Sequence, residues 1–343
     1  MRARIAAGLV VATAGMVTLL GGTANYAAAQ PDKEKNKGAK AAPPKHLYGH
    51  DLRVRKGGEK DFGPETPRIG VELFHDEANK ALVLISETGA LAVTKAPTVA
   101  LGADRKCEWK TAHDLNCRKA GEAEFTQKTK KWGVEIFQDR ATTQLLYVCE
   151  SGSVMLAPTP VGFVTEKGPK WHHALEPKVR APEQVAFDNA KKFGMEIFKD
   201  ENTGGLIYIT EVGMIAPAGT AAGAPTKIEA PKAQYGLDLR VRGADEPDFT
   251  DKTKRLGVEV FEDPNTKTLF YLTESGSVAT APLGKMADAK GVNWKSAMAL
   301  RARKGGEKDF DKAKKYGIEV FEDNRTGNLL FISETGAIAV LPK

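Results

Sequence analysis

A short apolar segment that opens with glycine recurs five times along the chain. Its pattern is Gly-[Val/Ile/Met]-Glu-[Val/Ile/Leu]-Phe, and successive copies start 63, 61, 63 and 60 residues apart. The opening glycines are Gly70, Gly133, Gly194, Gly257 and Gly317. Self-similarity at a fixed period indicates a solenoid, a propeller or an array. We therefore predict a repeat protein with five units of about 61 residues each.

Each unit divides into four short strands, as the last copy illustrates. Strands are predicted over residues 299–304, 318–323, 328–333 and 337–341, because these segments are rich in β-branched and aromatic residues. Residues 324–327 (Asn-Arg-Thr-Gly) form a hairpin turn, with Gly327 where a positive φ is needed. The resulting fold class is all-β.

The third strand of the unit is apolar on both faces, as Leu-Leu-Phe-Ile at 329–332 shows. Strands that are apolar on both sides are packed on both sides, as the blades of a propeller are. Four strands in each of five units predict a closed five-bladed β-propeller. The alternative is an open array of small α+β units, in which residues 309–315 form a short helix. An open array would need polar terminal copies, and neither terminal copy is more polar than the others.

The repeats define one domain over residues 46–343. Its copies span residues 46–97, 107–158, 171–217, 233–282 and 294–342, and the linkers are 98–106, 159–170, 218–232 and 283–293. The third copy departs most from the pattern, because Pro177 falls within its first strand. Proline cannot donate to a strand ladder, so we expect that strand to be unpaired or bulged there.

The first 29 residues read as a secretory signal peptide. A basic start (Met-Arg-Ala-Arg) precedes an apolar run over residues 5–20, and Ala-Ala-Ala at 27–29 supplies a cleavage site. The alternative is an uncleaved membrane anchor. Residues 30–45 contain almost nothing that could be buried and read as a flexible tether. We expect a protein that is secreted or located in the periplasm or cell envelope, and that has no membrane span after cleavage.

Carboxylates recur in every unit. They are Glu72, Glu135, Glu196, Glu259 and Glu319 in the second strand, Asp76, Asp139, Asp200, Asp263 and Asp323 in the hairpin, and Glu87, Glu150, Glu211, Glu274 and Glu334 after the third strand. A catalytic pair is needed once, in one cleft, whereas five identical sets indicate a structural role. Arginines in or after the first strand are the expected partners on the neighbouring strand, and the hairpin aspartates are expected to bond to their own turn.

Basic residues precede the opening glycine in four copies. They are Lys130, Lys131, Lys191, Lys192, Lys254, Arg255, Lys314 and Lys315. In a closed propeller they would lie on one rim, where they form either a solvated face or a basic ring that attracts polyanions. The net charge of +6 and the pI of about 9.0 favour such attraction. For an exported protein, acidic polymers are expected rather than nucleic acid.

An aromatic residue precedes the strand leucine in all five copies. These residues are Tyr48, Trp109, Trp171, Tyr235 and Trp294. They are candidates for a repeated ligand site, because an aromatic face stacks on sugar rings; alternatively, they wedge between blades. The plan of one aromatic and four strands in each of five copies resembles five-bladed lectin propellers of the tachylectin type. This resemblance concerns architecture alone and implies multivalent sugar binding.

The three cysteines lie in the second copy, and Cys107 with Cys117 is the pairing preferred for an exported protein, with Cys149 left over. The six histidines lack metal-ligand spacing, and Asp-Glu-Asn-Thr-Gly at 200–204 lacks the ligands of a calcium loop. No hydrolase, zinc-protease, phosphate-loop or dinucleotide motif occurs. We therefore expect no catalytic residues, no metal and no cofactor.

Three functions from different classes remain. The first is a non-catalytic, monomeric and multivalent binding module for carbohydrate or an acidic envelope polymer, since several near-equal sites gain by avidity. The second is a structural or protein-interaction scaffold of the cell envelope. The third, a propeller glycosidase, would need acidic residues in one copy that the others lack, and none is found.

Overall fold

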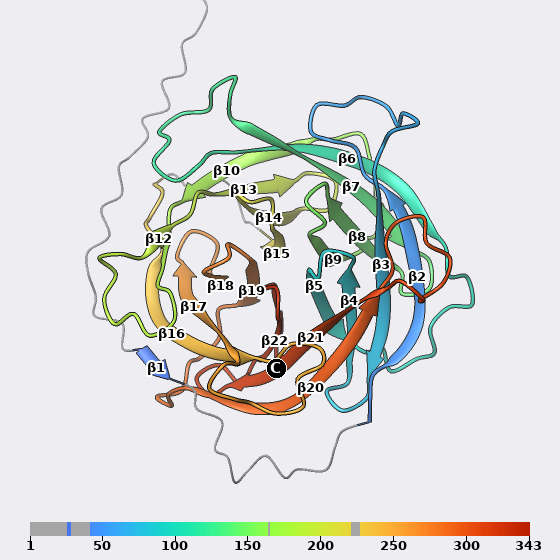
Figure 1. Ribbon diagram of the computed structural model, residues 1–343. Coiled ribbons are helices and arrows are strands. Elements are labelled where there is room, and N and C mark those ends of the chain that lie inside the picture. The colour runs from blue at the N-terminus through green and yellow to red at the C-terminus, as the bar shows by residue number, and fades with distance from the viewer. Residues whose placement is uncertain (1–25, 29–41, 164, 221–226) are drawn as a thin grey trace, which may run out of the picture.

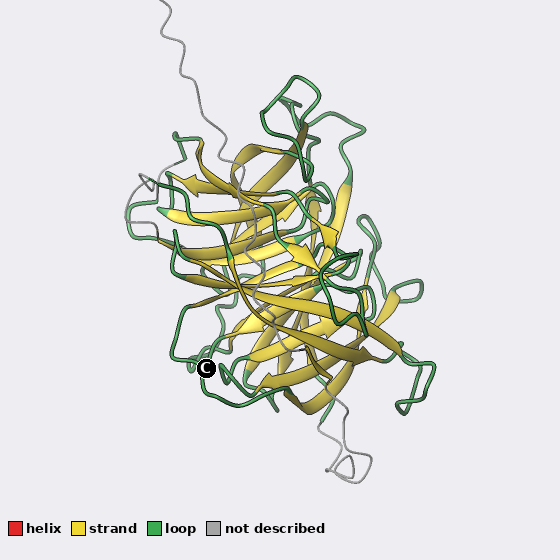
Figure 2. Ribbon diagram, turned by 90° about the vertical axis from the view of Figure 1, so that its left-hand side faces the viewer, coloured by secondary structure: helices red, strands yellow, loops and turns green. Residues whose placement is uncertain are grey.

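A computed structural model describes residues 26–28, 42–163, 165–220 and 227–343. Within these ranges the regular elements are all strands (Figure 2), and no helix there is long and apolar enough to span a bilayer. Residues 309–315, which the alternative open array would make a short helix, consist of turns and the start of a strand. The predicted signal peptide and tether lie mostly outside the described residues.

The strands form five sheets of four, one from each repeat, and we call these sheets blades 1 to 5. Within each sheet the strands are antiparallel and lie in sequence order. Their bounds are β2 Lys45–Arg53, β3 Arg68–Asp76, β4 Ala81–Ser86 and β5 Leu91–Lys95 in blade 1; β6 Cys107–Cys117, β7 Lys130–Asp139, β8 Gln144–Cys149 and β9 Val154–Pro158 in blade 2; β10 Pro169–Leu175, β13 Met195–Asp200, β14 Gly205–Thr210 and β15 Ile215–Thr220 in blade 3; β16 Lys232–Val241, β17 Lys254–Asp263, β18 Thr268–Thr273 and β19 Val278–Pro282 in blade 4; and β20 Val292–Ala302, β21 Lys314–Asp323, β22 Leu329–Ser333 and β23 Ile338–Leu341 in blade 5.

The outer two strands of each blade are longer than the sequence pattern predicts. In blade 5, β20 begins at Val292, not at Ala299, and its register with β21 runs from Val292 opposite Asp323 to Ala302 opposite Lys314. The repeated aromatics therefore lie within the first strand, and the basic residues lie within the second, except in blade 3, where Lys191 and Lys192 form the separate strand β12.

The five blades close into a ring (Figure 1). Strands β5, β9, β15, β19 and β23 lie innermost, and each contacts its neighbours around the axis, including β23 with β5. The predicted five-bladed β-propeller is confirmed, and the open array is wrong. The reason is that both faces of each blade are apolar and are buried only when a neighbouring blade packs against them.

An apolar core fills each contact between neighbouring blades, which we call a seam. At seam 5/1, for example, Phe74, Val83 and Ile85 of blade 1 pack with Tyr316 and Phe331 of blade 5. The other seams are filled in the same way.

The central channel is nearly filled by side chains. Its remaining space is about 50 Å³, and its lining is formed by the innermost strands. Met214, which opens β15, packs against the cores of three seams, 1/2, 5/1 and 3/4. The equivalent positions hold the small residues Ala90, Ser153, Ser277 and Ala337, so a single methionine fills the space that five small residues would leave.

The propeller has two unlike faces. On the connection face lie the long β2–β3 type connections and the β4–β5 type turns; on the hairpin face lie the β3–β4 type hairpins and the linkers between blades. Near the axis on the connection face, a hydroxyl of each blade donates to a glycine carbonyl of the next. The five bonds are Thr88 to Gly152, Ser151 to Gly213, Thr210 to Gly276, Thr273 to Gly336 and Ser333 to Gly89.

Blades 3 and 4 depart from the common plan. As predicted from Pro177, the first strand of blade 3 breaks: β10 ends at Leu175, and a separate pair forms between β11 (Lys178–Val179) and β12 (Lys191–Lys192). The short strand β1 (Tyr26–Ala28) pairs in parallel with the outer edge of β16, so blade 4 has five strands.

Candidate functional site at the seams

An arginine of each blade reaches across the seam to the second-strand glutamate of the next blade. At each seam the guanidinium forms two parallel bonds with the carboxylate, Nε to Oε1 at 2.6–2.7 Å and Nη2 to Oε2 at 3.1–3.2 Å. The pairs are Arg55–Glu135, Arg118–Glu196, Arg180–Glu259, Arg242–Glu319 and Arg303–Glu72. The prediction that arginines pair with these glutamates is therefore correct. The predicted location is wrong, because each arginine belongs to the preceding blade and not to the neighbouring strand of the same blade.

The same arginine holds its own connection in place. Its third nitrogen donates to the carbonyl five residues later, as Arg118 does to Ala123 at 2.6 Å, and its guanidinium lies 4.3–4.7 Å from the centre of a phenylalanine ring seven residues later. These rings are Phe62, Phe125, Phe187, Phe249 and Phe310. The sequence analysis missed them, although the recurring seven-residue spacing after the seam arginine was a usable signal.

Trp109, Trp171 and Trp294 lie at the outer edge of three seams. Each donates its indole N–H to the glutamate of the same blade, at 2.6, 2.7 and 2.6 Å. Each also meets the phenylalanine of the preceding blade at 81–89°, with ring centres 6.0–6.4 Å apart. Trp109 and Trp171 are 45% and 43% exposed, although the carboxylates that hold them are buried. At these two seams the indole is fixed at its N–H and remains partly exposed, whereas Trp294 is partly buried and packs against the core of seam 4/5.

Tyr48 and Tyr235 do not belong to this set. The tryptophans lie opposite Phe137, Phe198 and Phe321, whereas Tyr48 lies opposite Leu73 and Tyr235 opposite Val260, beyond a register shift. The residues equivalent to the tryptophans are His46 in blade 1 and Ala233 in blade 4. Both tyrosines are buried. The five aromatics predicted as one repeated site thus divide into three tryptophans at the surface and two tyrosines inside the seams.

The buried tyrosines belong to a second set of contacts, near the hairpin face. There a hydroxyl or imidazole of one blade meets the hairpin aspartate of the next, as in Tyr48–Asp139 at 2.7 Å, Tyr147–Asp200 at 2.7 Å and His173–Asp263 at 3.0 Å. As predicted, these aspartates also accept hydrogen bonds from their own turn, for example from the backbone N–H of Asn202.

Two of these aspartates have strongly depressed pKa values. Burial alone raises the pKa of Asp200 and of Asp263. The hydrogen bonds and charges of His113 and His173, with the tyrosine hydroxyls, outweigh burial and lower both pKa values to about 2. These groups are therefore ionised and stabilising at neutral pH, not poised for proton transfer.

The eight predicted rim residues do lie together on the connection face, but their charges are engaged. Five of them form ion pairs, which are Lys130–Glu150, Lys131–Asp114, Lys192–Glu176, Arg255–Asp238 and Lys315–Asp245. Of the remaining three, Lys191 and Lys314 lie over the rings of Phe193 and Tyr316, and Lys254 donates to the carbonyl of Glu334. Because a carboxylate balances five of the eight charges, the rim attracts a polyanion less than its sequence suggests.

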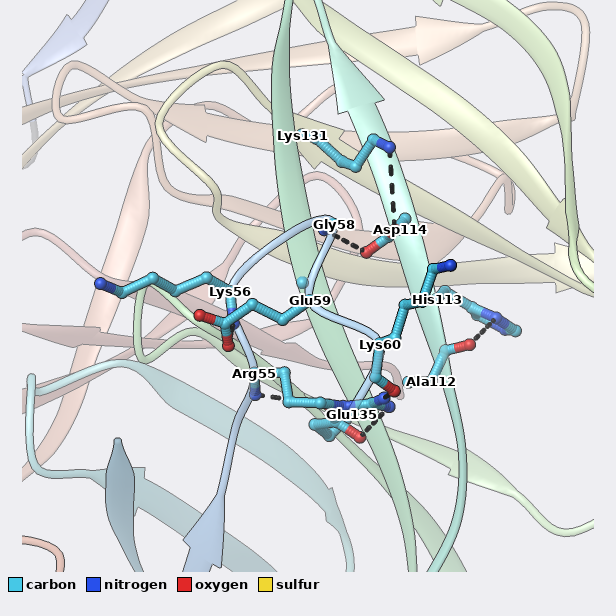
Figure 3. A pocket seen from close by; sticks show the side chains of 11 residues that line it. Arg55, Lys56, Gly58, Glu59, Lys60, Ala112, His113, Asp114, Lys131 and Glu135 are labelled. Carbon is cyan, nitrogen blue, oxygen red and sulfur yellow. Dashed lines mark hydrogen bonds and ion pairs between the residues drawn. The ribbon is translucent and has the colours of Figure 1, made fainter. Parts of the chain in front are cut away.

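A groove of about 450 Å³ opens at seam 1/2 (Figure 3). Residues 55–60 of the blade 1 connection form one side, and Ala112, Asp114, Lys131 and Glu135 of β6 and β7 form the other. Arg55 and Glu135, which lie in the groove, are also the residues that contact the Trp109 ring and its N–H. Trp109 does not itself line the groove, and these two residues connect the groove to its ring.

The predicted Cys107–Cys117 disulfide is wrong. All three cysteines are free, and these two end the same strand, β6, with Cys107 opposite Asp139 and Cys117 opposite Lys130. An extended strand rises about 3.3 Å per residue, so ten residues separate their Cα atoms by about 33 Å, far beyond bonding distance. Within the described residues, no group of three His, Cys, Asp or Glu side chains could hold a metal ion.

Comparisons with known proteins add little. No family model and no curated protein matches the chain. Among solved structures, a streptogramin B lyase matches at 10% identity over 87% of this chain and 88% of the lyase, with a TM-score of 0.12. A virginiamycin B lyase from Staphylococcus aureus matches at 10% identity over 86% and 88%, with a TM-score of 0.11. Similarity at these values carries no argument about the function of this chain.

Proposed function

We propose that this protein is a non-catalytic, extracytoplasmic binding module that holds carbohydrate at the tryptophan seams. The observation that carries the proposal is the repeated arrangement of Trp109, Trp171 and Trp294, in which a buried carboxylate accepts the indole N–H, while the side chains of Trp109 and Trp171 stay 45% and 43% exposed. Three such sites on one rigid ring give avidity for a repeating glycan. This is also what the tachylectin-type plan implies.

The tryptophan geometry suits stacking on a sugar ring. The Nε1–H bond and the perpendicular phenylalanine restrict each indole to one orientation, so little side-chain entropy is lost when a ligand binds. An exposed tryptophan face is a liability for a protein without a partner. The exposure of Trp109 and Trp171 at two equivalent positions supports a role in binding.

The charges support carbohydrate over an acidic polymer, and binding over catalysis. Five of the eight rim cations already face a carboxylate, so a continuous ring of unbalanced positive charge is not available. Each second-strand glutamate is bonded to an arginine in an equivalent way at every seam. A glycosidase needs one acid and one base in unlike environments, which such a symmetric set does not offer.

The test is glycan-array binding by the wild-type protein, the three Trp→Ala variants and the triple variant. Each single variant should lose part of the array signal, and the triple variant should lose all of it. Val161→Ala, a change at a fully exposed linker residue, is the matched control and should bind normally. Thermal melts should show that the half-exposed Trp171 costs less than the roughly 3–5 kcal/mol of a buried tryptophan.

The opposite result would support the scaffold alternative. If no glycan binds, or if the triple variant binds as well as the wild type while remaining folded, the tryptophans are parts of the seam and the module binds an envelope protein or nothing at all.

A further inference from the structure

We propose that the groove at seam 1/2 binds an acidic sugar, that is, a uronic acid or another carboxylated pyranose, with its ring on Trp109 and its carboxylate against Lys60 and Lys131. This inference rests on the proposed carbohydrate binding. It adds the chemical class of the ligand and assigns the acidic-sugar site to seam 1/2. It is carried by the volume and charge of the groove and by a lysine, Lys60, that the other tryptophan seams replace with Ala123 and Pro247.

The groove has one positive charge in excess. Four cationic and three acidic residues line it. Arg55 and Glu135 neutralise each other in the bidentate pair, and Lys131 lies 3.9 Å from Asp114. Within the described residues, neither Lys56 nor Lys60 has an acidic side chain within ion-pair distance, and Glu59 is the only remaining acid among the lining residues. A ligand with one negative charge per sugar therefore complements the groove.

The two lysines that matter lie on the side of the groove nearest β6. Figure 3 shows the Lys60 side chain extending toward β6, where Lys131 reaches Asp114, whereas the side chains of Lys56 and Glu59 point away from that strand. The weak 3.9 Å contact leaves the Lys131 ammonium able to take a better acceptor, because ammonium–carboxylate bonds form at about 2.7–2.9 Å. A ligand carboxylate at this point would accept from both lysines.

The volume is adequate for a sugar. At about 450 Å³ the groove lies within the range of about 300–1,000 Å³ typical of ligand sites. Hydrogen bonds already hold the backbone of the blade 1 connection: the Gly57 N–H donates to the Glu150 carboxylate, and the Gly58 N–H donates to Asp114. This connection therefore does not have to fold around the ligand.

The other tryptophan seams lack the second lysine. The residue five positions after the seam arginine is Lys60 at seam 1/2, but Ala123 at seam 2/3 and Pro247 at seam 4/5. The lysine equivalent to Lys131 is also taken, by Glu176 at seam 2/3 and by Asp245 at seam 4/5. These seams have the aromatic surface without the free positive charge, and we expect them to accept neutral sugars.

The test compares uronate-containing oligosaccharides with their carboxyl-reduced counterparts on one array at two salt concentrations. For the best-bound backbone, the wild type should prefer the acidic form by roughly tenfold, as expected for a hydrogen bond to a charged group, and the preference should shrink at high salt. Lys60→Gln combined with Lys131→Gln should abolish the preference and leave binding of the reduced glycan intact. Lys312→Gln, a change of an exposed lysine outside the groove, is the matched control.

The outcomes separate the two proposals. If reduced glycans bind through Trp171 and Trp294 but no acidic preference exists, or the double variant keeps that preference, the acidic-sugar site is wrong and the general function stands. If no glycan of either form binds, both proposals fail. Trp109→Ala should weaken the acidic form most, and equal loss for Trp171→Ala would also overturn the assignment to seam 1/2.

Discussion

One backbone position in each β3–β4 type hairpin has a positive φ. The values lie between 51° and 72°, and the residues are Lys80, Thr143, Gly204, Lys267 and Gly327. This left-handed conformation costs a residue with a Cβ about 1–2 kcal/mol, and β-branched threonine is the least suited of the five. The hairpin geometry is therefore imposed by the seam contacts of the preceding aspartate, not by the residue that adopts it.

Replacing Thr143 with glycine should stabilise the protein. The relief of about 1–2 kcal/mol exceeds the entropy that glycine adds to the unfolded chain, about 0.5–1 kcal/mol, so a net gain of about 0.5–1 kcal/mol is expected. Urea denaturation measures it. Gly327→Thr is the reverse change in the same hairpin position, and it should lower the free energy of unfolding. A lower free energy of unfolding in Thr143→Gly would show that the backbone of Thr143 is not strained.

The depressed aspartates predict a specific acid sensitivity. A carboxyl with a folded pKa of about 2 and an unfolded value near 3.9 binds protons more weakly when folded. Its contribution, about 2.5 kcal/mol per group, is full above about pH 5 and is lost as the pH falls toward 2. Asp200→Asn should remove part of the pH dependence of the unfolding free energy in that window. An unchanged slope in this variant would rule out the coupling to His113 and Tyr147.

At the scale of elements, the seam and not the single blade is the stable unit. Each blade offers two apolar faces, and each face is completed only by its neighbour. The arginine–glutamate pair crosses this apolar contact with its carboxylate buried. A buried carboxylate that loses its partner costs far more than an exposed pair contributes.

Removing one arginine of the set should therefore be severe. Arg118→Ala leaves Glu196 buried with only the Trp171 N–H as a side-chain partner, and the expected loss is about 3–5 kcal/mol. Arg140→Ala breaks the exposed pairs with Asp104 and Glu108 and should change the melting temperature little. A double change of Arg118 and Glu196 to methionine should recover most of the loss. Equal effects of the two alanine variants would show that the seam pair is not buried in solution.

The strands could be predicted from the sequence and the seam contacts could not. Five copies of Gly-x-Glu-x-Phe define the second strand, because every unit repeats its apolar pattern. The same repetition hides the contact partners. From the sequence, Arg55 could pair equally well with Glu72 of its own unit or with Glu135 of the next unit. Only the assembled ring shows that Glu135, 80 positions away, is the partner. Trp109 and Tyr48 likewise looked equivalent until the register shift in the first strand separated them.

At the scale of the whole molecule, closure depends on side chains and hydroxyl contacts alone. Blade 1 is built from β2–β5 and blade 5 from β20–β23, so no strand is shared across seam 5/1. This seam is held by Arg303–Glu72, by the Ser333 hydroxyl on the Gly89 carbonyl and by an apolar core. It is chemically the same as the four seams that the chain crosses with a linker.

A circular permutant should therefore fold. β2 begins and β23 ends on the hairpin face, where the natural linkers 96–106 and 283–291 join other blades with eleven and nine residues. Joining Pro342 to Lys45 with eleven residues and opening the chain within 96–106 should give a ring with a radius of gyration of about 19 Å, the value for a single globule of this length. X-ray scattering measures the radius. An elongated particle would show that the order of blades matters for closure.

Closure without a shared strand also has a consequence in time. The surface formed by Phe74, Val83 and Ile85 has its partner in Phe331 and Ile318, which are synthesised about 250 residues later. Because synthesis proceeds at about 5–20 residues per second, this apolar surface of blade 1 stays without its blade 5 partner for roughly 10–50 s. Blade 1 is thus the first made and the last completed, so a holding chaperone would find its binding site near the beginning of this chain and would lose it only when the final blade emerges.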